Sequence, residues 1–237
     1  KADLDLLAKP VGLAAWPGVT AIRPVNIIAL PDGLTPIAPL ASQHLPTRQF
    51  LTECCKLLMD AEKDLNALDA KSGDGDTGST LSSAARALIE ALDRLPLADH
   101  TQLLRAMGQE LSQTMGGSSG VLLAIFFAAA GDGASSGLGM RDALKAGLAR
   151  MQEIGGAELG DRTMIDALSP ALDAYDKGFA AAASAARAGA NQTATYVNAR
   201  AGRAAYINAR QLEGHIDPGA EAVARLFEFL ALRHSRS

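Results

Sequence analysis

Hydrophobic residues after residue 46 recur at steps of three and four, the spacing that gathers side chains on one face of an α-helix. Three such stripes run through Phe50, Cys54, Leu57, Ala61, Leu65 and Leu68; through Leu81, Ala84, Leu88, Leu92 and Leu95; and through Leu103, Met107, Leu111 and Met115. Further helical segments cover residues 121–130, 140–154, 163–175, 179–190 and the chain from 218. The pattern predicts an all-α barrel or bundle of about eight antiparallel amphipathic helices, with no strand pair.

Helix-capping residues support three of these boundaries. Thr47 has the residue type of an N-cap before the first stripe. Asp99 stands three residues before Gln102, the spacing of a capping box. Asp217 precedes Pro218 as an N-cap precedes a first-turn proline, so we expect the last helix to begin there.

The first 46 residues differ from the rest of the chain. They hold seven of its ten prolines, and prolines spaced in this way interrupt any long helix. We therefore expect an extended linker over residues 1–46 and one helical domain over residues 47–237. Because the sequence starts with Lys1, we also expect it to be a piece of a longer protein.

Charge, apolar run length and cysteine content indicate which partners and which cellular location to expect. The formal net charge is −4 and basic residues are scattered among acidic ones, so no basic surface for nucleic acid is expected. The longest apolar run, 121–130, is shorter than the roughly 20 residues of a membrane span. Cys54 and Cys55 are neighbours in an apolar stretch and resemble small core residues, which favours a reducing, cytoplasmic location.

Three carboxylates fall within eight positions of a glycine-rich segment between two predicted helices: Asp69, Asp74 and Asp76. Carboxylates crowded in this way repel one another unless a hard divalent cation neutralises them. Glycines at 73, 75 and 78 permit the tight turns that would aim all three side chains at one point. The alternative is a solvated acidic turn, a common use of Asp-Gly sequences.

Two familiar motifs that this segment resembles do not fit it. Gly73, Gly75 and Gly78 match the dinucleotide-binding G-x-G-x-x-G spacing, but no strand precedes them, and aspartates among them would repel a pyrophosphate. An EF-hand loop starting at Asp74 would need a bidentate glutamate where Ala85 stands. The remaining interpretation is a Mg²⁺ site in which the ion also binds phosphate oxygens, because Mg²⁺ takes few carboxylates from the protein.

A second glycine-rich loop, residues 115–120, runs directly into an apolar helix. Backbone N–H groups and the positive end of the helix dipole at such a start suit a phosphate. The loop lacks the lysine of a Walker A motif. A close helix crossing would require the same small residues, so both interpretations stay open. Likewise, Ser79 and Thr80 either donate hydroxyl hydrogen bonds to a ligand or cap a helix.

A third polar segment, residues 160–166, contains Arg162 just before a predicted helix start at Thr163. A guanidinium at this point could reach a phosphate, which makes Arg162 a candidate transition-state contact. The alternative is a surface ion pair with Asp161 or Asp166. No other catalytic residue is assigned.

Four motifs in this order resemble the nucleotide-binding domain of the dihydroxyacetone kinase family. They are Leu-Asp-x3-Gly-Asp-Gly-Asp-Thr-Gly at 68–78, Gly-Gly-Ser-Ser-Gly at 116–120, Arg-Thr-Met-Ile-Asp-Ala-Leu at 162–168, and Gly-Arg-Ala-Ala-Tyr at 202–206 before Asp-Pro-Gly-Ala at 217–220. The resemblance covers about residues 47–232. It implies a barrel of eight antiparallel helices with the nucleotide at one end.

The resemblance implies a role for each matching residue. Asp69, Asp74 and Asp76 would hold two Mg²⁺ ions that bridge the phosphates of ATP or ADP. The implied phosphate contacts are Thr77, Gly78, Ser79, Thr80, Gly117, Ser118 and Ser119. Thr163 and Met164 would border the base, and Arg162 would close over the site. The turn formed by Asp217, Pro218 and Gly219 would help cap the nucleotide.

The family has two branches, which differ in phosphoryl donor. One uses ATP on a fused chain, and the other keeps a bound ADP that a phosphotransferase protein rephosphorylates. Residues 6–17 resemble the end of a sugar-binding domain and the connector of the fused branch. We therefore expect an ATP-dependent kinase whose dihydroxyacetone-binding domain lies elsewhere, with a connector long enough for domain exchange in a homodimer. The alternatives are an ADP-carrying docking subunit and a helical interaction module that binds no nucleotide.

Overall fold

The computed structural model describes residues 39–196, 199 and 212–235. Most of the predicted linker, including the segment at 6–17, and the motif at 202–206 lie outside the described residues. A compact unit spans Pro39–Ser237, and its first helix begins at Leu45. The division into linker and domain at residue 46 stays a prediction.

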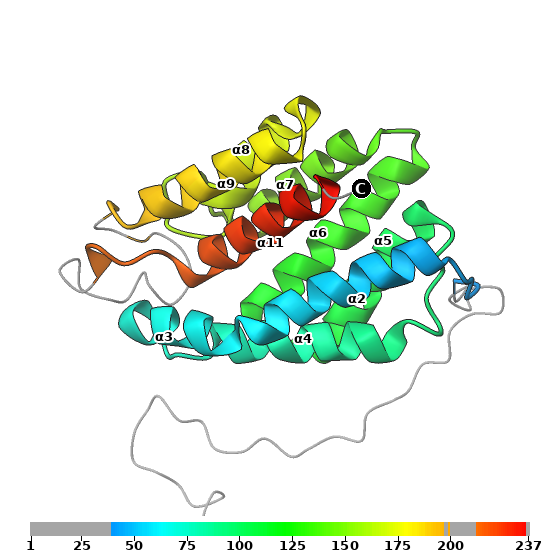
Figure 1. Ribbon diagram of the computed structural model, residues 1–237, viewed down its shortest axis with the longest axis horizontal. Helices are drawn as coiled ribbons and strands as arrows, with labels where there is room; N and C mark the ends of the chain where they lie inside the picture. Colours follow the sequence, from blue (N-terminus) through cyan, green and yellow to red (C-terminus); the bar gives the residue numbers. More distant parts are fainter. Residues whose placement is uncertain (1–38, 197–198, 200–211, 236–237) are drawn as a thin grey trace, which may run out of the picture. The chain divides into compact units, whose positions relative to one another are not determined.

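Nine α-helices and one 3-10 turn make up the described part of the chain. The helices are α2 (Leu45–Asp60), α3 (Glu62–Ser72), α4 (Thr77–Ala91), α5 (His100–Thr114), α6 (Gly117–Ser135), α7 (Met140–Gly155), α8 (Ile165–Asp173), α9 (Phe179–Thr193) and α11 (Pro218–His234) (Figure 1). The 3-10 turn η1 covers Tyr175–Lys177. Within these ranges the only extended pairing is an isolated bridge between Ser42 and Pro96, so the all-α prediction is confirmed.

The helices form a closed ring, because each packs against the next and the last returns to the first. Contacts run in order from α4 through α5, α6, α7, α8 and α9 to α11. Helix α11 packs in turn against α3 and α2, and both of these contact α4. Only Ala61 separates α2 from α3, and its N–H still donates to the carbonyl of Leu57 in the helical pattern. Because α2 and α3 act as one side, the ring has the predicted eight sides.

Two of the three predicted helix caps are present. The carboxylates of Asp99 and Asp217 each accept the backbone N–H three residues further on, at 3.0 Å and 2.8 Å. The prediction for Thr47 is wrong, because α2 begins two residues earlier, with His44 as its N-cap and Pro46 in its first turn. Proline suits a first turn, and the Thr47 hydroxyl hydrogen-bonds to Nδ1 of His44 instead (2.7 Å).

Small residues let the helices on either side of α6 approach it closely. A Cβ added to Gly108 of α5 would lie 2.8 Å from the carbonyl oxygen of Ala124 in α6. One added to Gly147 of α7 would lie 2.4 Å from that of Phe126. By length and composition alone α6 could cross a membrane, and in this fold it packs between α5 and α7.

Both cysteines belong to the apolar side of α2, as predicted. Cys55 is buried, Cys54 is half-buried, and both are free thiols. Burial raises the pKa of the Cys54 thiol to about 12 and that of Cys55 to about 11. At neutral pH they therefore behave as small hydrophobic residues and not as nucleophiles.

An ion-pair network joins α3, α9 and α11. Glu221 of α11 is buried and accepts hydrogen bonds from Arg187 of α9 and from Nε of Arg225 (2.7 Å). Nη1 of Arg225 also reaches Oδ2 of Asp64 in α3 at 2.9 Å. A buried carboxylate with two guanidinium partners is costly to leave unpaired, so the network holds α3 in register against α11.

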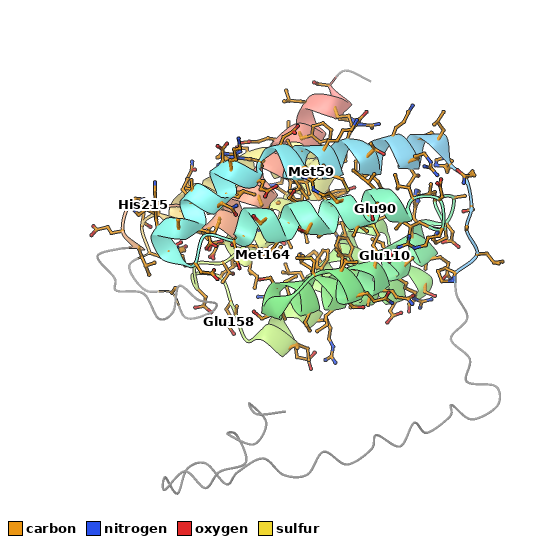
Figure 2. All side chains as sticks on the ribbon, turned by 90° about the horizontal axis from the view of Figure 1, so that it is seen from below. Met59, Glu90, Glu110, Glu158, Met164 and His215 are labelled. Atoms are coloured by element: carbon orange, nitrogen blue, oxygen red, sulfur yellow. The ribbon has the colours of Figure 1, made fainter. Side chains whose placement is uncertain are left out.

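The topology gathers the polar loops at one end. Alternate loops of an antiparallel ring lie at the same end, and the α3–α4 turn, the α5–α6 loop, the α7–α8 loop and the entry to α11 alternate in this way. The α3–α4 turn and the start of α11 lie toward the left of Figure 1. In Figure 2, His215 and Glu158 mark this end, and Glu90 and Glu110 lie toward the other.

Candidate functional site

Asp69, in the last turn of α3, organises the α3–α4 turn. It is buried, and its Oδ2 accepts hydrogen bonds from the backbone N–H groups of Asp76 (2.8 Å) and Thr77 (3.1 Å). These N–H groups open α4 and have no partner within the helix. The carboxylate of one helix therefore caps the next, which fixes the direction in which the turn leaves α3.

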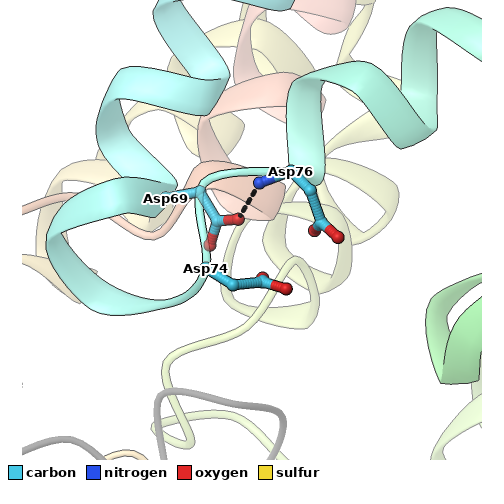
Figure 3. Close-up of side chains that lie close together, drawn as sticks. All are labelled: Asp69, Asp74 and Asp76. Carbon is cyan, nitrogen blue, oxygen red and sulfur yellow. Dashed lines mark hydrogen bonds between the residues drawn. The ribbon is translucent and has the colours of Figure 1, made fainter.

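Asp74 and Asp76 bring their carboxylates to the same place (Figure 3). One oxygen from each of Asp69, Asp74 and Asp76 lies within 4.8 Å of the others. Asp69 is buried and the other two are exposed, so the cluster opens to solvent on one side. The structure thus brings the three predicted ligands together, and their binding of a cation stays a prediction.

The donor set of this cluster fits a hard divalent cation. Carboxylate oxygens are the ligands that Mg²⁺ takes from proteins, and the exposed side leaves room for water or phosphate oxygens in its coordination shell. A solvated acidic turn, the alternative from the sequence, would let its carboxylates point apart to reduce their repulsion. Here they converge, and one of them is held in the protein interior.

Two glycines of the turn have no room for a side chain. A Cβ on Gly73 would lie 2.3 Å from Oδ1 of Asp69, and one on Gly78 would lie 2.1 Å from the carbonyl oxygen of Glu62. Gly75 has a φ of +80°, in the left-handed region that favours glycine. The spacing that resembles a dinucleotide motif therefore serves the turn geometry and the packing of α4 on α3.

A pocket of about 320 Å³ joins the α3–α4 turn to the α5–α6 loop. Its lining residues come from both segments and from the helices beside them: Asp76, Ser79, Thr80, Ser83, Thr114, Met115 and Gly116. Of these, Met115 and Gly116 belong to the glycine-rich loop but were not among the predicted contacts, and Ser83 and Thr114 lie outside both predicted segments. Ser83 follows Thr80 by one helical turn, so helical spacing could have indicated it. Thr114 reaches the pocket only through the packing of α5 against α4.

The start of α6 bears on the two interpretations of the second glycine-rich loop, which are a phosphate site and a close helix crossing. Gly120 serves packing, because its Cβ would lie 2.5 Å from Cβ of Met115. Gly116 and Gly117 face open space, and Gly117 has a φ of +73°. Helix α6 begins at Gly117 without a side-chain cap, with Ser118 and Ser119 exposed in its first turn. An exposed, uncapped helix start of this kind suits an anion.

Ser79 is tied to α3, which the sequence did not reveal. Its hydroxyl donates to Oε1 of Glu62 (3.0 Å) and accepts from Nδ2 of Asn66 (2.9 Å). Oδ1 of Asn66 accepts the backbone N–H of Ser79 (3.0 Å). Because the hydroxyl proton of Ser79 is already used, Thr80 is the better placed of the two to donate to a ligand in the pocket.

Two buried carboxylates hold the α7–α8 loop. Asp161 accepts the backbone N–H of Glu158 (2.8 Å), and Asp166 accepts those of Gly160 (2.6 Å) and Thr163 (2.8 Å). The hydroxyl of Thr163 accepts the N–H two residues further on at 3.2 Å. The helix start predicted near Thr163 is therefore present, and it is stabilised within the loop itself.

Arg162 lies inside the ring and not at its surface. Its relative exposure is 1%, and its Nη2 donates to the carbonyl oxygens of His215 (2.5 Å) and Leu212 (3.3 Å). Burial lowers the pKa of the guanidinium, and the nearby Asp217 opposes this effect. Both interpretations of the sequence expected a surface side chain, and the surface ion pair is not what the structure shows.

Gly219 lies beside Met164, so the segment predicted to border the base meets the turn predicted to cap the nucleotide. A Cβ on Gly219 would lie 3.2 Å from Cβ of Met164 and 3.1 Å from Oδ1 of Asp217. Asp217 and Pro218 are buried at the start of α11. Burial raises the pKa of the Asp217 carboxyl to about 6, although its hydrogen bond from the Ala220 N–H opposes the shift.

A larger groove of about 380 Å³ lies between α3, α9 and α11. Its lining residues are Asp64, Ala67, Leu68, Lys71, Arg187, Ile216, Glu221 and Arg225. Most of its charged groups belong to the ion-pair network described above, and none of the three clustered aspartates lines it. We therefore place the candidate site at the smaller pocket, which is lined by Asp76 of the carboxylate cluster and by Gly116, the N-cap residue of α6.

Comparison with known proteins identifies the family of this chain. Residues 71–232 match the DAK2 domain family. The chain belongs to this family. Dihydroxyacetone kinase from Citrobacter freundii is 51% identical over 179 residues, covering 73% of this chain and 32% of that protein. Human triokinase/FMN cyclase is 36% identical over 248 residues, covering 94% of this chain and 42% of that protein.

Crystal structures of the C. freundii kinase share the fold of this DAK2 domain. The native form gives a TM-score of 0.77 at 39% identity and covers 98% of this chain and 42% of that one. The complex with AMP-PNP and Mg²⁺ gives 0.74 at 38% identity, with 97% and 41% covered. The chain thus spans less than half the length of these relatives. The family match includes Asp74 and Asp76 but begins after Asp69, whose place in the cluster comes from the structure.

Proposed function

We propose that this DAK2 domain binds Mg·ATP in the pocket between the α3–α4 turn and the α5–α6 loop, and donates the γ-phosphoryl group to dihydroxyacetone held by a separate domain. One observation carries the proposal: three converging carboxylates adjoin a pocket that also borders an uncapped helix start. The carboxylates alone would repel a triphosphate, and the helix start alone would accept any small anion. With a divalent cation between them, the two features select a metal-bound polyphosphate.

The arrangement suits phosphoryl transfer, which needs positioning and neutralisation of charge more than covalent help from the protein. Mg²⁺ held by Asp69, Asp74 and Asp76 would neutralise charge on the phosphates. Backbone N–H groups of residues 117–119 and the hydroxyl of Thr80 would bind phosphate oxygens. The hydrogen bonds from the Asp76 and Thr77 N–H groups to Asp69 keep the turn rigid, so the carboxylates would be oriented before the nucleotide arrives.

The base would lie between the α7–α8 loop and the start of α11. Met164 supplies an apolar wall there, and Gly219 stands beside it without a side chain that would narrow the space. Its neighbour Asp217 is anchored as the N-cap of α11. A base held at this distance from the carboxylates would set the position of the phosphates between the two loops.

The acceptor substrate is assigned to a separate domain for two reasons. The relatives named as dihydroxyacetone kinase and triokinase extend far beyond the matched region, since the chain covers 32% and 42% of them. The pocket also offers the Asp76 carboxylate and several hydroxyls for a metal-bound polyphosphate, but none of its lining residues is a histidine or lysine suited to a neutral sugar-like carbonyl. The kinase names of the relatives and the AMP-PNP and Mg²⁺ in the solved complex support the proposal.

Calorimetry of nucleotide binding tests the metal-dependent part. We expect the wild-type chain to bind ATP with Mg²⁺ and to lose most of that affinity with EDTA. Asp74→Asn and Asp76→Asn should each weaken Mg·ATP binding by at least about tenfold, because they remove ligand charge from exposed side chains of the cluster. Glu90→Gln, an exposed change on α4 at the other end of the ring, is the control. Unchanged affinity in both aspartate variants would remove the metal assignment.

Reconstitution tests the transfer step. The chain is mixed with a separately produced dihydroxyacetone-binding domain, and phosphorylation of dihydroxyacetone is measured with ATP as donor. Turnover with ATP supports the kinase proposal. An ADP-carrying subunit would instead retain nucleotide through purification and require a phosphohistidine donor. A helical interaction module would show no nucleotide binding in the calorimetry.

A further inference from the structure

Arg162 combines two features that are unfavourable for folding. It is the non-glycine residue with a positive φ, 62°, among those described, and such a backbone costs roughly 1–3 kcal/mol for an L-residue. Its relative exposure is 1%, yet the buried Nε and Nη1 have no hydrogen-bond partner in the described part of the chain. A strained residue with buried, unsatisfied donors persists only where its surroundings hold it in place, and such residues cluster at functional sites.

The contacts of Arg162 show what it holds. Nη2 donates to the carbonyl oxygens of Leu212 and His215, which are the residues that lead into the Asp217 cap of α11. On its own side, Asp161 and Asp166 fix the α7–α8 loop through three backbone N–H groups. Arg162 therefore joins a rigid loop to the entry of α11, across fifty residues of sequence.

The consequence of this link is seen at Met164 and Gly219. Met164 follows Arg162 by two residues, and Gly219 follows His215 by four. The two meet so closely that an added Cβ on Gly219 would lie 3.2 Å from Cβ of Met164. The charge of Arg162 also attracts the buried carboxyl of Asp217.

We propose that Arg162 is a positioning residue for the nucleotide base: it clamps the entry of α11 to the α7–α8 loop and so sets the spacing between Met164 and Gly219. This inference rests on the proposed function. It assigns Arg162 no contact with phosphate, because a side chain with 1% exposure cannot close over a ligand that enters from solvent. The expectation from the sequence, in which Arg162 contacts phosphate, makes a different prediction that can be measured.

The test compares two ligands that share phosphates but not a base. Dissociation constants are measured by calorimetry for Mg·ATP and for Mg²⁺ with inorganic tripolyphosphate, which needs only the carboxylate cluster and the start of α6. We expect Arg162→Met, which keeps the length of the side chain but donates no hydrogen bond, to weaken Mg·ATP binding by about tenfold and tripolyphosphate binding by less than about twofold. Arg162→Lys, which retains the charge and one donor group, should give an intermediate loss for ATP.

Leu172→Ala serves as a stability control. Leu172 is buried in the last turns of α8, away from the α7–α8 loop, and its truncation lowers the melting temperature without touching either carbonyl. The ratio of ATP affinity to tripolyphosphate affinity should stay at the wild-type value in this variant. If Arg162 acted only through stability, both variants would leave that ratio unchanged.

The outcomes separate the proposals. Equal losses for ATP and tripolyphosphate in Arg162→Met would overturn the positioning role and favour a phosphate contact. No loss for either ligand would also overturn it. If the wild-type chain itself binds no Mg·ATP, the proposed function fails, and this result is distinguishable because it does not depend on any variant.

Discussion

The two sides of the candidate site are built in different ways. The carboxylate side is local: Asp69, Asp74 and Asp76 lie within eight residues, and a buried carboxylate caps the helix that follows it. The side formed by Met164 and Gly219 is assembled from two segments that are distant in sequence and are joined by the hydrogen bond from buried Arg162 to His215, 53 residues away. One side presents exposed charge to solvent, and the other encloses charge in the protein.

This difference predicts how each side responds to mutation. A local cluster with exposed carboxylates can lose ligand charge and keep its fold. Where two distant segments are held together by buried groups, mutation of those groups should lower both the nucleotide affinity and the stability of the fold.

Asp69→Asn should have the largest effect on binding. The amide oxygen can still accept the N–H groups of Asp76 and Thr77, so the turn keeps its shape, but the negative charge nearest the interior is lost. We expect Mg·ATP affinity to fall by about a thousandfold, or roughly 4 kcal/mol, with a change in melting temperature of only a few degrees. Calorimetry and thermal unfolding measure the two quantities. A large loss of stability at unchanged affinity would show that the carboxylate cluster is structural.

Asp217→Asn should change the pH dependence of folding. The pKa of Asp217 in the folded chain is raised from 3.8 to about 6, so its contribution to stability is complete below pH about 4 and is lost as pH rises through 6. A shift of this size corresponds to roughly 3 kcal/mol. Because asparagine can cap α11 without a charge, the stability of the wild type relative to the variant should fall by up to this amount between pH 4 and 7.

Denaturant unfolding of both proteins at several pH values measures this difference, and the comparison cancels other titrating groups. Glu221, whose pKa is lowered by its two arginine partners despite burial, is present in both chains and acts in the opposite direction. A difference that does not change with pH would show that Asp217 is not held as a buried acid, and the contrast between the two sides would weaken.

Gly78→Ala and Gly116→Ala form a matched pair from the carboxylate side. An added Cβ at Gly78 would lie 2.1 Å from a backbone oxygen of α3, whereas one at Gly116 would meet nothing within 4 Å. We expect Gly78→Ala to lower the free energy of unfolding by about 2 kcal/mol and Gly116→Ala by less than about 0.5 kcal/mol. Chemical denaturation checks both values. Similar effects in the two variants would contradict the close packing of α4 on α3.

Ser79→Ala and Thr80→Ala should give the smallest effects. The first should change mainly the stability of the fold, and the second mainly the affinity for Mg·ATP. Ser79 bonds to Glu62 and Asn66 of α3, so its loss should reduce stability by about 1 kcal/mol and change Mg·ATP affinity little. Thr80 lines the pocket, so its loss should weaken Mg·ATP binding by about fivefold with little change in stability. The reverse pattern would assign the phosphate contact to Ser79.

Helical periodicity predicted the fold well because the apolar positions of each helix are set by local spacing. The all-α ring of eight sides followed from those stripes, and two caps were identified from the chemistry of a side chain and the N–H three residues away. Thr47 failed as a cap because a good capping residue stood beside a proline that is better suited to the first turn, and residue type alone does not rank them.

The amino-acid sequence alone was enough to locate the carboxylate cluster and the glycine-rich start of α6, since each lies within one short segment and depends on the residue types of a turn. It could not show that the two border one pocket, that Ser79 is held by α3, or that Arg162 points inward. Those facts depend on which helices pack side by side and on which charges the packing encloses. Burial and long-range contact are properties of the folded ring, and no local pattern of residues encodes them.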